Sequence, residues 1–214
     1  MKLAIYGAGG FAREAAPLAL DDPECDVVFV SDTVEEIGTR PNGIRVVSYP
    51  ELIAEHPERR VVIAVADSAA RRTLAEKCAK DGFAFGDIVA ASHQRGHSVE
   101  IGEGSILCGN TIFTSNIRIG RHFHGNIASY VAHDCVIGDF VTFSPQAGCS
   151  GHVVIEDDAF IGSGAILRPG NRDKPLTIGK GARVGMGAIV TRDVPPGVTV
   201  FADPARVLGP VRPR

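Results

Sequence analysis

No stretch of this 214-residue chain reaches the ~18–20 consecutive apolar residues that a membrane-spanning helix requires. An excess of one charge is also missing, because 22 Lys and Arg residues oppose 25 Asp and Glu residues and leave a formal net charge of −3. Proteins that bind nucleic acid normally carry a basic stripe. We therefore expect neither a membrane nor nucleic acid as a partner.

Cysteine pairs at C-x-x-C spacing are lacking as well. The five cysteines are odd in number, and Cys108, Cys135 and Cys149 fall inside the repeat described below, where small buried residues recur. The N-terminus reaches glycines after only a few apolar residues, which is too early for a signal peptide. These features favour reduced thiols and a cytoplasmic location. The length allows one or two domains.

What the chain has instead is a six-residue repeat, which begins at Ile101. Twelve blocks follow in register to Arg172, five extra residues (173–177) interrupt them, and the repeat resumes at Ile178. Eleven of the fifteen blocks up to Pro195 open with Ile, Leu or Val, and twelve carry Ser, Thr, Ala, Val or Cys in fifth place. Neither the alternation of a strand nor the 3.6-residue period of a helix produces this spacing.

A period of six is typical of a solenoid of very short parallel strands. Three blocks make one triangular coil, so each aliphatic residue stacks on the residue eighteen positions later. Glycine, the commonest second residue, suits the corners, where φ is often positive. The repeat predicts a β-helix domain over residues 93–214, with a Pro-rich tail from residue 196 that wraps over a neighbouring surface.

Residues 1–92 have a different pattern, and we expect them to form a separate domain. Short apolar strands alternate with helical segments, which is typical of a small parallel α/β unit. Pro17 is expected to kink or shorten the first helix, and Asp67 or Ser68 to cap the last one. The expected strands cover residues 2–6, 27–30 and 61–65, and the expected helices residues 11–20, 51–56 and 67–80.

A glycine-rich turn follows the first expected strand. Residues 7–12 read G-A-G-G-F-A and fit the G-x-G-x-x-A pattern between a strand and a helix. The backbone at Gly9 and Gly10 can approach a phosphate that faces the helix N-terminus, and Asp32 is placed to accept a hydrogen bond from a ribose hydroxyl. The alternative is a tight turn without a ligand. Only one nucleotide-binding half is present, so a single nucleotide is favoured over a dinucleotide.

The repeat is disturbed between Arg121 and Asp139. Large or polar residues replace the usual ones there, with Gly125 in an aliphatic place and Phe123 in a small one. Departures from a strong local rule are expected at functional sites. His133 has an outward-facing place and is followed by Asp134, so it is a candidate general base, because histidine as a residue type has an unperturbed pKa near neutrality. An ordinary solvated turn histidine is the alternative.

The other histidines do not predict a metal site. His93 and His97 are four residues apart, but they precede the repeat, and Gly96 argues against a helix there. No H-x4-H spacing falls within the coils. We expect no metal, and a place at the surface or a subunit contact for His93, His97, His122 and His152.

Four features resemble a known family. They are the hexads, G-A-G-G-F-A-R-E at residues 7–14, H-D-C-V-I-G-D at residues 133–139, and a closing run of V-G-M-G-A-I-V-T-R-D-V-P-P-G and A-D-P-A-R. Together they resemble the bacterial nucleotide-sugar N-acetyltransferases of the sialic-acid O-acetyltransferase-like group. The likeness covers essentially the whole chain. Many acyltransferases share the hexads, so the glycine-rich domain joined to H-[DE]-C-x-I-G-[DE] is the more specific signal.

The resemblance implies a homotrimer of left-handed β-helices with active sites between subunits, and acetyl-CoA as the co-substrate. It gives His133 the role of general base, Asp134 that of the orienting carboxylate and Asn126 a contact to the sugar. Several relatives carry a second histidine where this chain has Thr142. The nucleotide would lie near Gly9, Gly10 and Asp32, with Arg71 serving a phosphate or the base, or else solvated on a helix face. Acetyl-CoA would use backbone amides around Gly151, Ser163 and Met186, with Arg206 near its nucleotide end.

The implied reaction is N-acetylation of the 4-amino group of a 4-amino-4,6-dideoxyhexose on a nucleoside diphosphate, of the GDP-perosamine type, for surface polysaccharide (O-antigen) biosynthesis. GDP and UDP carriers both fit these residues. There are two alternatives to this interpretation: O-acetylation of a sugar hydroxyl, and a non-catalytic trimeric scaffold that senses a nucleotide. A scaffold would have no reason to break its own repeat. Residues 173–177 form either a loop that closes on CoA or a plain bulge.

Overall fold

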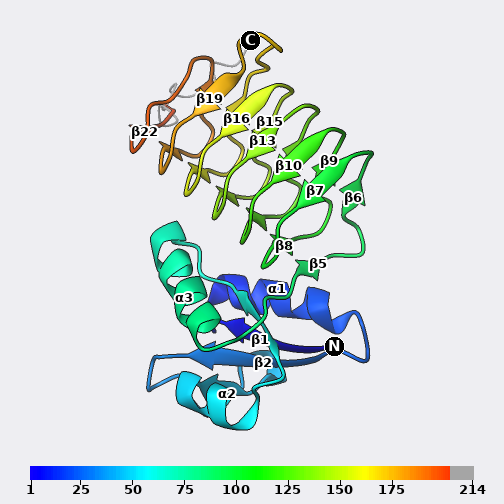
Figure 1. The fold of residues 1–214 in the computed structure, drawn as a ribbon, viewed down its shortest axis with the longest axis vertical. Helices are drawn as coiled ribbons and strands as arrows, with labels where there is room; N and C mark the ends of the chain where they lie inside the picture. Colours follow the sequence, from blue (N-terminus) through cyan, green and yellow to red (C-terminus); the bar gives the residue numbers. More distant parts are fainter. Residues whose placement is uncertain (203–214) are drawn as a thin grey trace, which may run out of the picture.

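The computed structural model describes residues 1–202, which form an α/β domain with a β-helix stacked on it (Figure 1). The α/β domain contains four parallel strands in the order β3-β2-β1-β4. Its strands are β1 (Lys2–Tyr6), β2 (Asp26–Ser31), β3 (Val46–Ser48) and β4 (Arg60–Ile63). Its helices are α1 (Gly10–Leu20), α2 (Tyr49–Glu55) and α3 (Ser68–Lys80), with the short 3-10 turn η1 (Pro41–Gly43) before β3.

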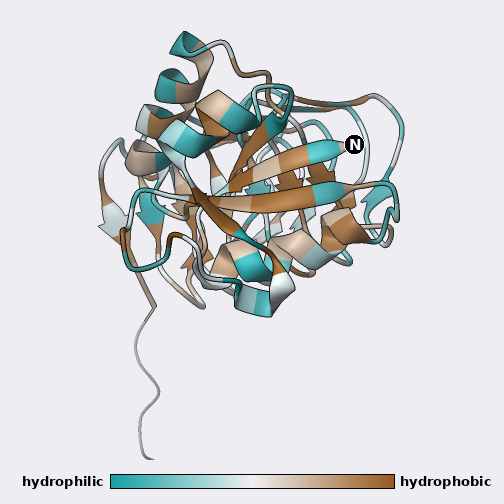
Figure 2. Cartoon of the chain, turned by 90° about the horizontal axis from the view of Figure 1, so that it is seen from below, coloured by the Kyte–Doolittle hydropathy of each residue, from teal (hydrophilic) through white to brown (hydrophobic). Residues whose placement is uncertain are grey.

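The sequence predicted most of this domain. Figure 2 shows the sheet strands coloured hydrophobic along most of their length, as the apolar runs indicated. Asp67 caps α3 by accepting a hydrogen bond from the Ala70 N–H at 2.9 Å. Strand β3 was missed because it spans three residues, and α1 continues through Pro17 instead of ending there.

The second domain is a left-handed parallel β-helix with three faces. The first face contains β5 (Ile88–Val89), β8 (Ile106–Leu107), β11 (His124–Gly125), β14 (Thr142–Phe143), β17 (Phe160–Ile161), β20 (Arg183–Val184) and β22 (Thr199–Val200). The second contains β6 (Gln94–Arg95), β9 (Ile112–Phe113), β12 (Tyr130–Val131), β15 (Gly148–Cys149), β18 (Ile166–Leu167) and β21 (Ile189–Val190). The third contains β7 (Val99–Ile101), β10 (Ile117–Ile119), β13 (Val136–Ile137), β16 (Val153–Ile155) and β19 (Leu176–Ile178).

Coil pairing starts a few residues before the predicted domain boundary. Strand β5 already pairs with β8, in the register Ile88 with Ile106. Each later strand pairs with the strand one coil away, eighteen residues on, until the five extra residues shift the register at β19. The apolar first places of the hexads point inward and form one buried cluster along the coils.

Most corners of the β-helix are turned by a residue with positive φ. We name the corners by the faces they join: corner 1/2, corner 2/3 and corner 3/1. Corner 2/3 is turned by Ser98, Asn116, Asp134 and His152, with φ between 53° and 59°. Corner 3/1 is turned by Gly104, His122, Phe140, Asp158 and Gly181. Non-glycine residues adopt this region infrequently, with Asn, Asp and His favoured, so most of these choices follow from backbone geometry.

The α/β domain covers the lower part of the first face. Helix α1 lies between the sheet and the first coils, where its buried alanines share a cluster with Ile88, Ile106 and Cys108 (Figure 1). Helix α3 reaches along corner 3/1, and Phe140 of that corner packs in the cluster beneath it. Within residues 1–202, no helix is long and apolar enough to cross a membrane.

Candidate active site

The predicted base and its carboxylate meet at corner 2/3. His133 Nδ1–H donates to Asp134 Oδ2 at 2.7 Å, and Asn116 Nδ2 donates to Asp134 Oδ1 at 3.1 Å. The hydrogen bond from His133, followed by that from Asn116, lowers the pKa of Asp134. With Nδ1 carrying the proton, Nε2 of a neutral His133 is left as a proton acceptor. The arrangement is that of a general base oriented by a carboxylate.

Gly151 provides the space for the imidazole. It lies one coil after His133, and a Cβ added to it would stand 2.5 Å from His133 Cε1. Any side chain at position 151 would therefore displace the ring. Among residues 1–202, no acceptor takes the Gly151 backbone N–H, so this donor is free beside the ring.

His152 is a site residue that sequence reasoning missed. Its side chain is 30% exposed, in agreement with the expected place at the surface, and its Nε2 lies 3.7 Å from Asp134 Oδ2. Its ring is perpendicular to that of His133, with centroids 5.2 Å apart. The signal was available, because His152 follows Asp134 by eighteen residues and Asn116 precedes it by eighteen. All three turn corner 2/3 and form one column.

A cavity of about 590 Å³ opens beside this column. It is lined by Asp134, His152, Val154, Asn171, Arg172 and Pro175. The extra residues 173–177 therefore border the site at Pro175. Their turn is built on Asn171, whose Oδ1 accepts the N–H groups of Asp173 and Lys174 at 3.1 and 2.8 Å.

In the described part of the chain, two clusters of three His, Asp or Glu side chains have donor atoms within 4.8 Å of one another. One is the group His133, Asp134 and His152, and the other lies on and after α2. In the first, the 2.7 Å contact between His133 and Asp134 is a direct hydrogen bond with no space for an ion between the two atoms. Donor geometry therefore favours proton transfer over metal binding at corner 2/3.

The predicted substrate role of Arg71 is not what the structure shows. Its side chain is fully buried between the domains, where it donates to the carbonyl oxygens of Val65 and Phe140 at 2.7 and 2.6 Å and to Thr142 Oγ1 at 2.9 Å. It also contacts His124 Nδ1 at 3.2 Å. Burial lowers the pKa of Arg71 to about 10, so the guanidinium stays charged at neutral pH. Arg71 joins the domains and is neither solvated nor open to a phosphate.

His122 was expected at the surface or a subunit contact, and this prediction is wrong; no place was predicted for His124, which is buried as well. His124 is completely buried, with Nε2 2.9 Å from the Ile63 carbonyl and its ring against Phe11. His122 is 1% exposed and stacks on Phe140 at 4.7 Å. Neither is at the surface, because the α/β domain covers the face and corner on which they lie. Desolvation lowers the pKa of His122 to about 4 and that of His124 well below its usual value.

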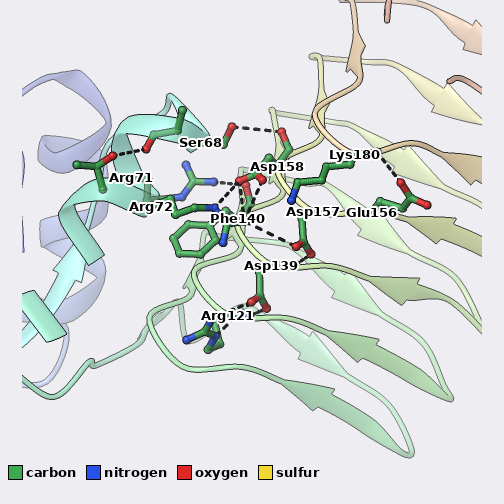
Figure 3. A network of polar contacts seen from close by, with 12 residues as sticks. Ser68, Arg71, Arg72, Arg121, Asp139, Phe140, Glu156, Asp157, Asp158 and Lys180 are labelled. Carbon is green, nitrogen blue, oxygen red and sulfur yellow. Dashed lines mark hydrogen bonds and ion pairs between the residues drawn. The ribbon is translucent and has the colours of Figure 1, made fainter. Parts of the chain in front are cut away.

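Corner 3/1 is fastened to α3 by a polar network (Figure 3). Arg72 Nη2 binds both oxygens of Asp158 at 2.9 Å, and Ser68 Oγ donates to the Asp158 carbonyl at 3.2 Å. One step along the same corner, Arg121 Nη2 donates to Asp139 Oδ2 at 2.9 Å. The bonds from Ser68 and Arg72 to Asp158 join α3 to the β-helix. The pair of Arg121 and Asp139 links two neighbouring coils of the β-helix itself. None of these residues lies on corner 2/3 with His133.

The unusual pair Phe123 and Gly125 has a packing explanation. The Phe123 ring lies inside the coil against Phe113 and Phe143. A Cβ on Gly125 would come within 3.0 Å of that ring. The Phe123 ring occupies the volume that Gly125 leaves free. Core packing therefore explains this part of the disturbed repeat, which is not a functional signal.

The glycine loop of the α/β domain is open. A Cβ at Gly9 or Gly10 would meet nothing within 4 Å, so packing does not require glycine at either position. Gly9 precedes α1 at the carboxyl edge of the parallel sheet, where ligands bind in such folds. Asp32, at the same edge, accepts from Tyr6 Oη at 2.7 Å and remains half exposed.

The other predicted ligand contacts lie on a different corner. Asn126, Ser163 and Met186 all follow strands of the first face and sit on corner 1/2. Corners 1/2 and 2/3 are separated by the second face, so one protomer does not bring these residues to His133. Arg206, together with the A-D-P-A-R motif beyond Ala202, lies outside the described residues.

Comparison with known proteins places this geometry in a family. Residues 2–78 match the model described as the PglD N-terminal domain, and residues 152–192 match that of the hexapeptide repeat of succinyl-transferase. The chain is 41% identical over 213 residues to GDP-perosamine N-acetyltransferase of Escherichia coli O157:H7, an alignment that covers 94% of each chain.

Solved structures agree with this match. WeeI from Acinetobacter baumannii AYE superposes with a TM-score of 0.91 at 48% identity, over 97% of this chain and all of that one. PerB from Caulobacter crescentus, solved in complex with CoA and GDP-perosamine, superposes with a TM-score of 0.84 at 27% identity over 98% of both chains.

Proposed function

Because the chain belongs to the family of hexapeptide-repeat sugar N-acetyltransferases that includes GDP-perosamine N-acetyltransferase, we propose that it acetylates the 4-amino group of a GDP-linked 4-amino-4,6-dideoxyhexose. Acetyl-CoA is the acetyl donor. The observation that carries the proposal is the His133–Asp134 hydrogen bond at an exposed corner, beside a free backbone donor at Gly151.

The α/β domain, residues 1–92, binds the nucleotide. Gly9 and Gly10 leave room for the diphosphate at the N-terminus of α1, and Asp32 meets the ribose or the base. A GDP carrier is favoured over UDP because two of the relatives named above involve GDP-perosamine. Arg71 has no part in this site, since its donors are already taken.

The chemistry takes place at His133. Its Nε2 accepts a proton from the sugar amine while the amine nitrogen attacks the thioester carbonyl carbon. Asp134 holds the ring tautomer and stabilises the imidazolium that forms. The Gly151 N–H meets the developing oxyanion; such a donor typically lowers the barrier by about 2.7–4 kcal/mol. The new C–N bond forms, the C–S bond breaks, and the CoA thiolate takes the proton from His133.

A homotrimer completes the site. The second face exposes an apolar column formed by Ile112, Tyr130, Ile166 and Ile189, which are 37–72% exposed. Such a column is typical of a protein interface. His133 and Gly151 border it on corner 2/3, whereas Asn126, Ser163 and Met186 border it on corner 1/2. Packing second faces together brings corner 1/2 of one protomer to corner 2/3 of another, so sugar and CoA contacts come from two subunits.

We further propose that the enzyme works in the cytoplasm, on a precursor of a surface polysaccharide. All five cysteines are free and buried in the structure, as is usual in a reducing compartment. The loop at residues 173–177 borders the cavity beside His152, and we assign it to the CoA side of the site.

The test is release of free CoA thiol from acetyl-CoA in the presence of three acceptors. These are a GDP-linked 4-amino-4,6-dideoxyhexose, its UDP-linked counterpart and the GDP-linked sugar with a hydroxyl at C4. We expect release with the amino sugars, faster with the GDP carrier. Release with the hydroxyl sugar alone would identify an O-acetyltransferase, and release with none would leave a nucleotide-sensing scaffold.

A further inference from the structure

We propose that His152 is a positioning residue that shares the Asp134 carboxylate with His133 and sets the pH at which His133 becomes a base. The inference rests on the proposed role of His133. His152 lies on the same corner, one coil beyond Asp134.

The geometry points to a shared carboxylate. Asp134 Oδ2 accepts from His133 at 2.7 Å and faces His152 Nε2 at 3.7 Å, so both imidazoles approach the same oxygen. The opposite oxygen, Oδ1, is held by Asn116 at 3.1 Å. One oxygen of the carboxylate is therefore held by Asn116, and the other lies close to both imidazoles.

The backbone does not require histidine at position 152. Its φ of 57° is close to that of Asn116 in the same column, at 55°. Asparagine is well tolerated in this region and already turns the corner two coils below. The His152 side chain is 30% exposed, so burial does not demand a ring either. What histidine adds there is a titratable charge.

The sign of the effect follows from the charges around the pair. The groups facing the imidazoles are Asp134, the guanidinium of Arg172 across the cavity, and the Cys135 thiol beside the His133 carbonyl at 3.5 Å. A protonated His152 partly neutralises the negative charge of Asp134 and repels a positive charge on His133. A positive charge on His152 therefore opposes protonation of His133, and a neutral side chain at position 152 removes this opposition.

The variant that tests this is His152→Asn, which keeps the backbone conformation and removes the charge. The acid limb of kcat/KM should move to higher pH by about 0.5 unit or more, the size expected for two charges ~5 Å apart near a surface. His97→Asn is the matched control: it lies on the same corner, two coils before His133, and should leave the limb in place. A His152→Asn profile that loses rate without moving its limb would overturn the proposal.

Proton NMR titration of the imidazole Cε1–H signals gives a readout that does not need catalysis. In the wild type, the His133 and His152 signals should each show two steps, and the His133 step should move to higher pH in His152→Asn. Independent single-step curves would refute the sharing. If no acceptor releases thiol, the proposed function fails, while the titration still decides whether His152 and His133 share Asp134.

Discussion

Corners 2/3 and 3/1 have the same backbone conformation but differ in solvent exposure. Each is turned by residues near φ 55–60° that repeat every eighteen positions, Asn116, Asp134 and His152 on one and His122, Phe140 and Asp158 on the other. On corner 2/3 the dyad residues His133 and Asp134 are 53% and 38% exposed and hydrogen-bond to each other. On corner 3/1, His122 and Phe140 are buried beneath α3.

The difference shows that the repeat fixes where a side chain lies, whereas burial beneath the α/β domain determines its chemistry. An imidazole on the open corner keeps a free Nε2 for proton transfer. One on the covered corner is desolvated, so its pKa falls and its ring serves to pack against aromatic neighbours. Three substitutions test this comparison between the two corners.

Removing the proposed base on the open corner should have the largest effect. His133→Ala is expected to lower kcat by about 10²–10⁴-fold, because that is the usual contribution of a positioned general base. Nucleotide binding, measured by calorimetry, should be unchanged because the α/β domain is untouched. His97→Ala, on the same corner two coils earlier, should keep the wild-type rate. Near-wild-type kcat in His133→Ala would remove this residue from the mechanism.

Removing the buried cation beneath the covered corner should cost stability. Arg71→Met leaves several buried acceptors unpaired, each worth about 1–3 kcal/mol, so we expect the free energy of unfolding to fall by about 3 kcal/mol. Arg72→Met, its neighbour on α3, removes a partly buried ion pair to Asp158 that still contacts solvent and should cost about 1 kcal/mol. Urea denaturation compares the two. Equal losses would contradict the burial argument.

The covered histidines should make stability depend on pH. The folded pKa of His122 is about 4 and an unfolded histidine titrates near 6.5, so below pH ~6.5 the unfolded chain binds a proton that the folded one does not. Stability contributed by the neutral ring is complete above that pH and declines toward pH 4, by up to about 1.4 kcal/mol per pH unit. His122→Asn should flatten this decline in urea midpoints measured from pH 7 to 4.5. An unchanged slope would contradict the assignment.

The sequence predicted the architecture because the repeat is a local rule. Hexads, the strand–helix alternation and the cap at Asp67 each act within a few residues, and the predicted fold and family resemblance are confirmed. The dyad was visible for the same reason, since His133 and Asp134 are adjacent. Their roles remain a proposal.

The residues that sequence reasoning misplaced depend on contacts between distant segments. Arg71 reaches Phe140 and Thr142 about seventy positions away, and the ring of His122 packs against Phe85 of the α/β domain. No local pattern records which face of the β-helix the α/β domain covers. His152 was different, because counting eighteen residues from Asp134 would have found it.

The most direct test is a crystal structure with CoA and a GDP-linked 4-amino sugar bound. We expect His133 Nε2 of one protomer within about 2.6–3.2 Å of the sugar amine, with the nucleotide held on the α/β domain at the same subunit boundary. A His133 ring that points into solvent, with amine and thioester meeting elsewhere, would contradict it.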